Sequence, residues 1–172
     1  MMVSRRRILR IGGGILAGLA WPRLPLAEEP VTIRMQGNKD GSHVWFDPMG
    51  LRIQPGQTLR WINMDLGNSH TTTAYHPRNF ERPRRIPESA EPWNSDYLLP
   101  NETFSITLTA EGVYDFFCIP HEHAGMVGRI VVGHPTERDR TTTSAAEPIP
   151  EAALRAFPTV EEIMDRGMVR PS

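Results

Sequence analysis

The sequence predicts an all-β domain made of short strands. Several runs alternate apolar and polar residues with a period of two, which places the apolar side chains of each run on one face of a strand. Turn-forming dipeptides separate these runs, and no long amphipathic helical pattern interrupts them. With 172 residues and 39% apolar content, the chain is long enough for one such domain with a single core and extensions.

The first predicted strands carry their apolar residues on one side. Val31, Ile33 and Met35 share one face of the first strand. Leu59 and Trp61 share one face of a later strand in the same way. The turns predicted along the chain are Asp40-Gly41, Asp47-Pro48, Pro55-Gly56, Pro100-Asn101 and Glu111-Gly112.

The run from residue 103 to residue 109 alternates without a break. It places Phe104, Ile106 and Leu108 on one buried face of a strand. The next strand is predicted over residues 113–118, where Cys118 has the same parity as the aromatic residue Phe116. We therefore expect the thiol of Cys118 to point toward the core, and Phe117 to point away from it.

Cys118 is the only cysteine in the chain, and it begins a C-x2-H-x4-M motif with His121 and Met126. A thiolate, an imidazole and a weakly binding thioether favour copper, and a second histidine would complete the His2Cys set with an axial methionine that is typical of blue-copper sites. The best candidate is His70, 48 residues upstream, between two predicted strands. The alternative is that Cys118 and Met126 are ordinary core residues, but their joint spacing favours a metal site.

The stretch from Val31 to Gly133 resembles plastocyanin and its bacterial plastocyanin-like and amicyanin-like relatives, which are type 1 blue copper proteins of the cupredoxin family. The most specific part is residues 118–132, with Pro-His, Ala-Gly-Met-Val-Gly and a closing apolar strand. Gly37-x3-Gly41-Ser42 and Pro55-Gly56 add weaker support. The resemblance implies a two-sheet Greek-key cupredoxin sandwich that holds one type 1 copper ion between loops at one end and transfers single electrons.

The resemblance also implies where redox partner proteins dock. In the family, the histidine of the Cys-His-Met loop, here His121, exposes its ring edge within an apolar patch. His43 and His123 stand where leucine and glycine are common, so this patch is expected to be more polar here. Thr71 replaces the usual asparagine, and we expect its hydroxyl to take over part of the hydrogen bonding between the two ligand loops. Phe117 stands where plant proteins often have a tyrosine that is linked to a second, remote electron route. Phe117 keeps the aromatic ring but lacks the hydroxyl, so the resemblance gives less support for such a route here.

Residues 1–27 are predicted to be an export signal. Ser4-Arg5-Arg6-Arg7-Ile8-Leu9-Arg10 resembles the twin-arginine motif, and the apolar stretch over residues 11–21 is short for a membrane span. Cleavage after Ala27 or Ala20 would deliver the protein to the periplasm; an uncut leader that anchors it is the alternative. Removing residues 1–27 leaves 14 basic and 20 acidic residues, a net charge of about −6. With one cysteine, no disulfide within the chain is expected.

The long connection over residues 75–99 is rich in proline and arginine. One interpretation is a loop pinned to the sandwich by Phe80, Trp93 and Tyr97, with solvated charges. The other is a basic docking patch for a partner with an acidic face, formed by Arg78, Arg82, Arg84 and Arg85. Long irregular loops of this kind are usually functional or packed on themselves.

The sandwich domain is expected to span residues 28–133, followed by a linker and C-terminal tail over residues 134–172. A short helix is predicted in the tail, because Thr159-Val160-Glu161-Glu162 forms a capping box before Ile163 and Gly167 offers a stop. The apolar face of this helix needs cover. Either it packs back on the sandwich or it forms a partner interface.

The sequence favours an electron carrier over an enzyme. It lacks a G-x-S-x-G motif, a P-loop and a net basic domain, which removes support for hydrolase, nucleotide and nucleic-acid functions. His121-Glu122-His123 is an isolated H-x-H pattern, whereas multicopper oxidases need several. We therefore expect redox partner proteins and no small-molecule substrate. The alternative function is copper delivery or storage, which usually relies on open sites rich in methionine and histidine.

Overall fold

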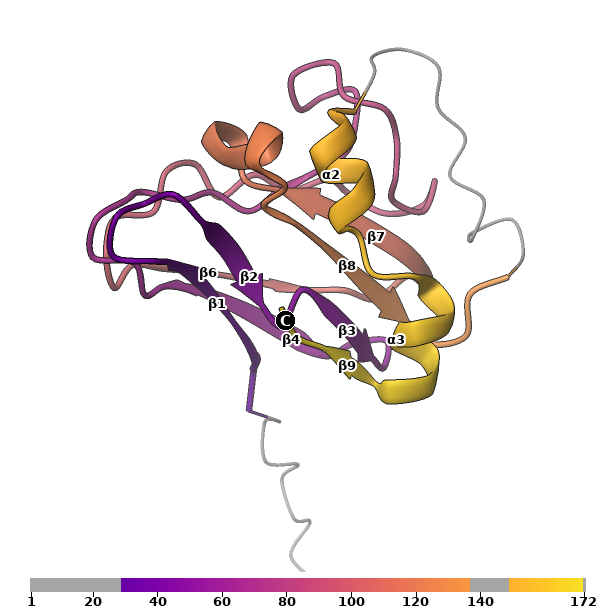
Figure 1. Ribbon diagram of the computed structural model, residues 1–172. Coiled ribbons are helices and arrows are strands. Elements are labelled where there is room, and N and C mark those ends of the chain that lie inside the picture. Colours follow the sequence, from indigo (N-terminus) through magenta and orange to yellow (C-terminus); the bar gives the residue numbers. More distant parts are fainter. Residues whose placement is uncertain (1–28, 137–148, 172) are drawn as a thin grey trace, which may run out of the picture.

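The computed structural model describes residues 29–136 and 149–171, and these form two β-sheets packed face to face (Figure 1). The first sheet has the order β2-β1-β4-β6 and the second the order β5-β7-β8-β3-β9. Both are mixed, because β1 runs parallel to β4 and β3 runs parallel to β8. The strands are β1 Val31–Gly37, β2 Val44–Asp47, β3 Gly50–Ile53, β4 Thr58–Asn63, β5 Thr73–Ala74, β6 Thr103–Thr107, β7 Gly112–Phe117, β8 Val127–Val132 and β9 Met168–Val169. The predicted two-sheet β-sandwich is confirmed.

The core between the sheets follows the predicted alternation. Ile33, Met35 and Leu59 are all buried in it. Trp61 is fully buried at its centre, with its ring 5.4 Å from the ring of Phe116 in an edge-on contact. Each such side chain contributes about 1.5–3 kcal/mol by leaving water. Strand β6 lies at the edge of its sheet, which explains why its inward residues are only partly buried.

Strand β7 is buried on both faces. Phe116 and Cys118 lie in the core between the sheets, as their parity predicts. Phe117 points to the opposite face, but it is buried as well, in a cluster with Tyr75 and with Ala153 of the C-terminal tail. The tail therefore packs back on its own sandwich and covers the outer face of the second sheet.

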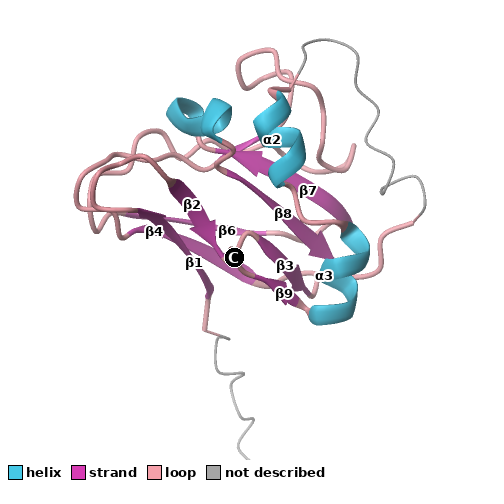
Figure 2. Cartoon of the chain, in the orientation of Figure 1, coloured by secondary structure: helices cyan, strands magenta, loops and turns pink. Residues whose placement is uncertain are grey.

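The tail contains the helices α2 Glu151–Ala156 and α3 Val160–Arg166 (Figure 2). Helix α3 is the predicted one: Thr159 caps it by accepting a 3.1 Å hydrogen bond from the amide of Glu162, and Gly167 ends it in the left-handed conformation. Helix α2 and strand β9 were not predicted. Helix α2 has only six residues, and the two-residue strand β9 exists only through its pairing with β3.

A charged cluster holds the tail against the sandwich. The ring of Phe157 lies between two guanidinium groups, 5.0 Å from that of Arg85 and 5.1 Å from that of Arg129. Both arginines pair with the fully buried carboxylate of Asp115. Arg129 also donates a 2.8 Å hydrogen bond to the carbonyl of Pro158. These contacts fix the chain where α2 leads into α3.

The connection over residues 75–99 is irregular, as predicted, and Trp93 anchors it in the core. The two other expected anchors are wrong, because Phe80 and Tyr97 are 60% and 50% exposed. Within the described ranges, neither of the tail helices nor any other helix combines the length and apolarity that a membrane span requires.

Candidate metal centre

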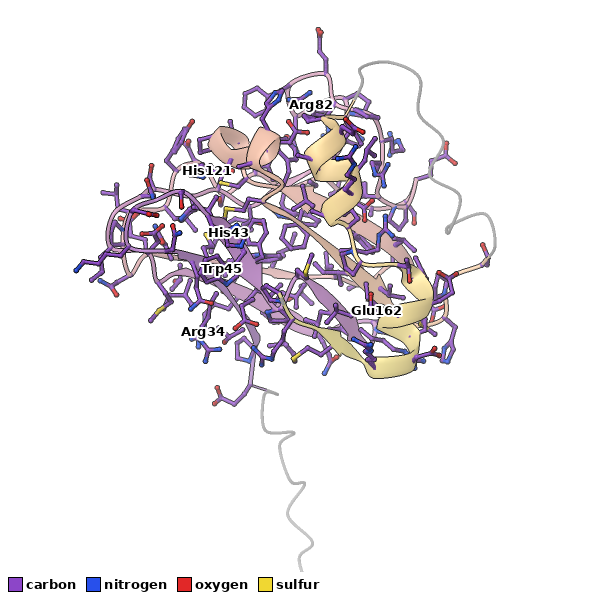
Figure 3. All side chains as sticks on the ribbon, viewed as in Figure 1. Arg34, His43, Trp45, Arg82, His121 and Glu162 are labelled. Carbon is purple, nitrogen blue, oxygen red and sulfur yellow. The ribbon has the colours of Figure 1, made fainter. Side chains whose placement is uncertain are left out.

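The predicted metal-binding residues lie at one end of the sandwich, in the loops that leave it. His70 lies in the loop between β4 and β5, and Cys118 directly follows β7. The 3₁₀ helix η1, Ile119–Ala124, carries His121 (Figure 3). Gly125 ends this helix with a φ of 82°, which returns the chain to β8 through Met126.

Three of the four predicted residues converge on one point. The Sγ atom of Cys118 lies 3.7 Å from Nδ1 of His70 and 3.4 Å from Nδ1 of His121. The three donor atoms all lie within 4.8 Å of one another. The backbone of Met126 lies beside them: its carbonyl accepts a 3.0 Å hydrogen bond from the amide of Cys118, and its amide donates a 3.1 Å bond to the carbonyl of His121. The side chain of Met126 is fully buried.

The two histidines are in the protonation state that suits a soft cation, whereas the thiol must lose its proton to bind one. Burial lowers the pKa of His70 and of His121, so both imidazoles are neutral and offer a lone pair. Burial raises the pKa of the Cys118 thiol to about 11, although the amide of Thr71 donates to its sulfur at 3.3 Å. A buried thiol faced by two neutral imidazole nitrogens is a donor set that fits copper.

Thr71 ties the two loops together. Its hydroxyl accepts a 2.8 Å hydrogen bond from the amide of Ile119, which directly follows Cys118. Its own amide donates to the sulfur of Cys118. The expected hydrogen bonding of the Thr71 hydroxyl between the two ligand loops is therefore present.

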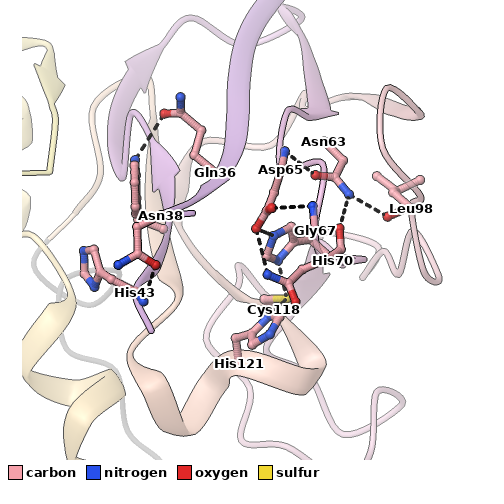
Figure 4. Close-up of polar contacts among 12 residues, drawn as sticks. Gln36, Asn38, His43, Asn63, Asp65, Gly67, His70, Leu98, Cys118 and His121 are labelled. Atoms are coloured by element: carbon pink, nitrogen blue, oxygen red, sulfur yellow. Dashed lines mark hydrogen bonds and ion pairs between the residues drawn. The ribbon is translucent and has the colours of Figure 1, made fainter. Parts of the chain in front are cut away.

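Two buried carboxylates that the sequence analysis did not single out support the centre. Asp65 lies 3.1 Å from Nε2 of His70 (Figure 4). Glu122, next to His121, accepts a 2.8 Å hydrogen bond from the hydroxyl of Tyr75 and pairs with Arg82. Neither contact has a local sequence signal, because each carboxylate meets its partner only through the folding of a loop.

A family model described as copper-binding proteins of the plastocyanin/azurin family matches residues 33–133, more than half of the chain. The chain belongs to this family. It is thus a cupredoxin, a member of a class of copper-binding proteins that generally transfer electrons.

Named relatives agree with this assignment. The cupredoxin is 31% identical over 141 residues to the chloroplastic plastocyanin of Chlamydomonas reinhardtii, which covers 77% of this chain and 86% of that protein. It is 29% identical over 112 residues to a pseudoazurin of Methylorubrum extorquens, with 64% and 66% covered. A solved pseudoazurin structure from Sinorhizobium matches with a TM-score of 0.58 and 27% identity, over 81% of this chain and 99% of that one.

The structural match extends into the tail of the cupredoxin. Residues 1–133 make up less than four-fifths of the 172-residue chain, so a match over 81% must reach the C-terminal segment. The sequence motifs that carry the resemblance stop at Gly133, so they did not indicate this extension.

The arginines of the 75–99 connection do not form one solvated patch. Arg85 is buried against Asp115, and Arg82 is largely buried against Glu122. Arg78 pairs with the exposed residue Glu91. The basic docking patch is therefore wrong for Arg82 and Arg85, because buried carboxylates take up their charges.

Proposed function

We propose that this cupredoxin is an exported, periplasmic carrier that passes single electrons between redox partner proteins. One type 1 copper ion would be held by His70, Cys118, His121 and Met126. The observation that carries the proposal is the convergence of two imidazole Nδ1 atoms on the sulfur of Cys118. When bound, copper supplies a one-electron couple between Cu(I) and Cu(II).

The protein's own contribution is a site that is already assembled. Thr71 holds Cys118 and the start of η1 in place, and burial excludes water from the thiol and from His70. Fast electron transfer requires that the site change little between oxidation states, which such a tied site favours.

The surface around His121 is our candidate for docking of partner proteins. Of the three converging residues, His70 and Cys118 are buried and His121 is only partly buried. His123, in the same helix η1, is exposed, and the ring of His43 stacks on that of Trp45 with their centroids 5.0 Å apart. A groove beside η1, lined by His43, Trp45, Ala124 and Ala152 among others, adds apolar surface to this end. We propose that partner proteins dock here.

Copper delivery or storage is the competing function. A delivery protein must release its metal readily, whereas Cys118 and His70 are both completely buried here. The burial therefore favours a carrier that retains copper. The twin-arginine signal and the domain limits 28–133 and 134–172 remain part of this proposal, and residues 1–28 lie outside the described ranges.

Spectroscopy and a competition assay test the function. The Cu(II) protein should show an intense thiolate-to-copper charge-transfer band, which Cys118→Ser abolishes because a hydroxyl does not supply that transition. Met126→Leu should keep the band but raise the midpoint potential, since a lost thioether destabilises Cu(II) relative to Cu(I). With a chelator present, electron exchange with a redox protein should be much faster than the loss of copper to the chelator. Copper that leaves as fast as electrons are exchanged would instead support delivery.

A further inference from the structure

We propose that Asp65 is a positioning residue that sets the reduction potential of this site. Its carboxylate would hold the ring of His70 in the orientation and tautomer that direct Nδ1 at the metal, and its buried negative charge would favour the more highly charged Cu(II). This inference rests on the proposed function. It concerns a residue beyond the four predicted ligands.

The contact between the two side chains fixes the tautomer of His70. Oδ2 of Asp65 lies 3.1 Å from Nε2 of His70, and the histidine is completely buried (Figure 4). An ionised carboxylate only accepts hydrogen bonds, so Nε2 carries the proton. The lone pair is then on Nδ1, the atom that faces the sulfur of Cys118.

Asp65 is itself held in place. Its Oδ1 accepts a 2.9 Å hydrogen bond from the amide of Gly67, and its Oδ2 accepts a 3.0 Å bond from the side chain of Asn68. The amide of Asp65 donates to the side chain of Asn63, which in turn donates to the carbonyl of Leu98. Asp65 is only 7% exposed, and its carboxylate has three hydrogen-bond donors: Gly67, Asn68 and His70. These donors stabilise its negative charge and fix it next to the ring of His70.

Gly37 leaves the space that this arrangement needs. A Cβ atom at position 37 would lie 2.1 Å from Oδ2 of Asp65 and 3.3 Å from a methyl of Val44. Even alanine would therefore displace the carboxylate from the ring of His70. This gives Gly37, at the end of β1, a role in the metal centre through Asp65.

The charge of Asp65 should act on the oxidation states unequally. The carboxylate contacts Nε2, the ring nitrogen that does not face the sulfur of Cys118, and it would increase the electron donation of the ring to a bound metal as well as acting through space. Both effects stabilise Cu(II) more than Cu(I). Removing the charge should therefore raise the midpoint potential. We expect the ratio of Cu(II) to Cu(I) affinity to fall by about tenfold, which corresponds to ~59 mV for a one-electron couple.

The test compares Asp65→Asn with Asp40→Asn in the full chain. Asparagine at position 65 keeps an acceptor for His70 and removes the charge. Asp40 is a matched control, because it is an exposed carboxylate of the β1–β2 loop whose side chain bonds to Ser42. Voltammetry of the copper-loaded proteins should show a raised potential for Asp65→Asn and an unchanged one for Asp40→Asn. Equal shifts, or no shift in Asp65→Asn, would overturn the inference.

Two further variants keep the result interpretable. Gly37→Ala retains the charge but moves it, so it should raise the potential as well. In the copper-free protein, nitrogen NMR should show His70 protonated at Nε2 in the wild type and in Asp65→Asn, and a mixture of tautomers in Asp65→Leu. A single Nε2 tautomer in Asp65→Leu would overturn the positioning role. A wild type that fails to bind copper would overturn the proposed function instead.

Discussion

The hydroxyl of Tyr75 donates a 2.8 Å hydrogen bond to the carboxylate of Glu122, the residue that directly follows His121. The other oxygen of the same carboxylate pairs with Arg82. Burial, together with the charge of Glu122, raises the pKa of Tyr75 well above its usual range, so the phenol remains a donor. Through these two contacts, the long 75–99 connection fixes the helix that carries His121.

Glu122→Gln should loosen this helix. The variant keeps the shape of the side chain but loses the buried negative charge that pairs with Arg82. We expect a loss of about 1–3 kcal/mol in the free energy of unfolding of the copper-free protein. Copper transfer to a chelator should also become faster.

A matched control for this variant is Glu91→Gln. Glu91 also pairs with an arginine, Arg78, but both side chains are largely exposed. Its replacement should leave stability and copper transfer unchanged, since exposed ion pairs contribute little. If the two variants behaved alike in denaturant titrations, the buried pair would have no special role.

Thr71→Val should weaken the link between the two donor loops. Valine has nearly the same shape but lacks the hydroxyl that accepts from the amide of Ile119. An amide left without its acceptor costs about 1–3 kcal/mol when it is buried, and somewhat less here because Ile119 is partly exposed. Thr71→Ser keeps the acceptor and should remain close to the wild type. Chemical denaturation of both copper-free variants would show the difference, and identical curves for valine and serine would refute the role of the hydroxyl.

Copper binding should release about one proton at pH 8. The pKa of the Cys118 thiol is raised to about 11, so the thiol is protonated at pH 8 in the copper-free protein and must lose its proton to bind as thiolate. The two histidines have lowered pKa values and contribute none at this pH. The apparent affinity should therefore increase with pH up to about 11. Calorimetry in buffers of different ionisation enthalpy measures the release, and a value near zero would mean that the thiolate already exists without metal.

Phe157→Ala should loosen the tail where α2 leads into α3. The ring lies between the guanidinium groups of Arg85 and Arg129 and is partly buried. We expect a loss of about 2 kcal/mol, from apolar burial and two cation–π contacts. Hydrogen exchange in α2 should become faster. Leu154→Ala, a change at a half-exposed position of the same helix, is the control and should have little effect.

The local features of the fold and of the metal centre could be predicted because they depend on neighbours in the sequence. The spacing of Cys118, His121 and Met126, the parity of Phe117 and the cap at Thr159 all belong to this kind. The contact between Asp65 and His70 depends on how the loop after β4 folds, and no pattern indicates it.

The charges of the 75–99 connection show the same limit more strongly. Arg85 and Asp115 are 30 residues apart and meet only in the folded protein. A cluster of arginines in sequence therefore indicated a surface patch, although two of the four have buried partners. Strand β9 was missed for a related reason, since two residues form a strand only when the edge of β3 is available.

The cover over Phe117 has a kinetic consequence. Tyr75 and the tail residue Ala153 bury Phe117 on the outer face of β7. If partners dock around His121, as proposed above, closing this side would leave donor and acceptor the same contact area, which they would have to use one after the other. Turnover would then follow a strict alternation, in which the reduced protein dissociates and diffuses before it is oxidised. A redox-inactive analogue of either partner should act as a competitive inhibitor of the other.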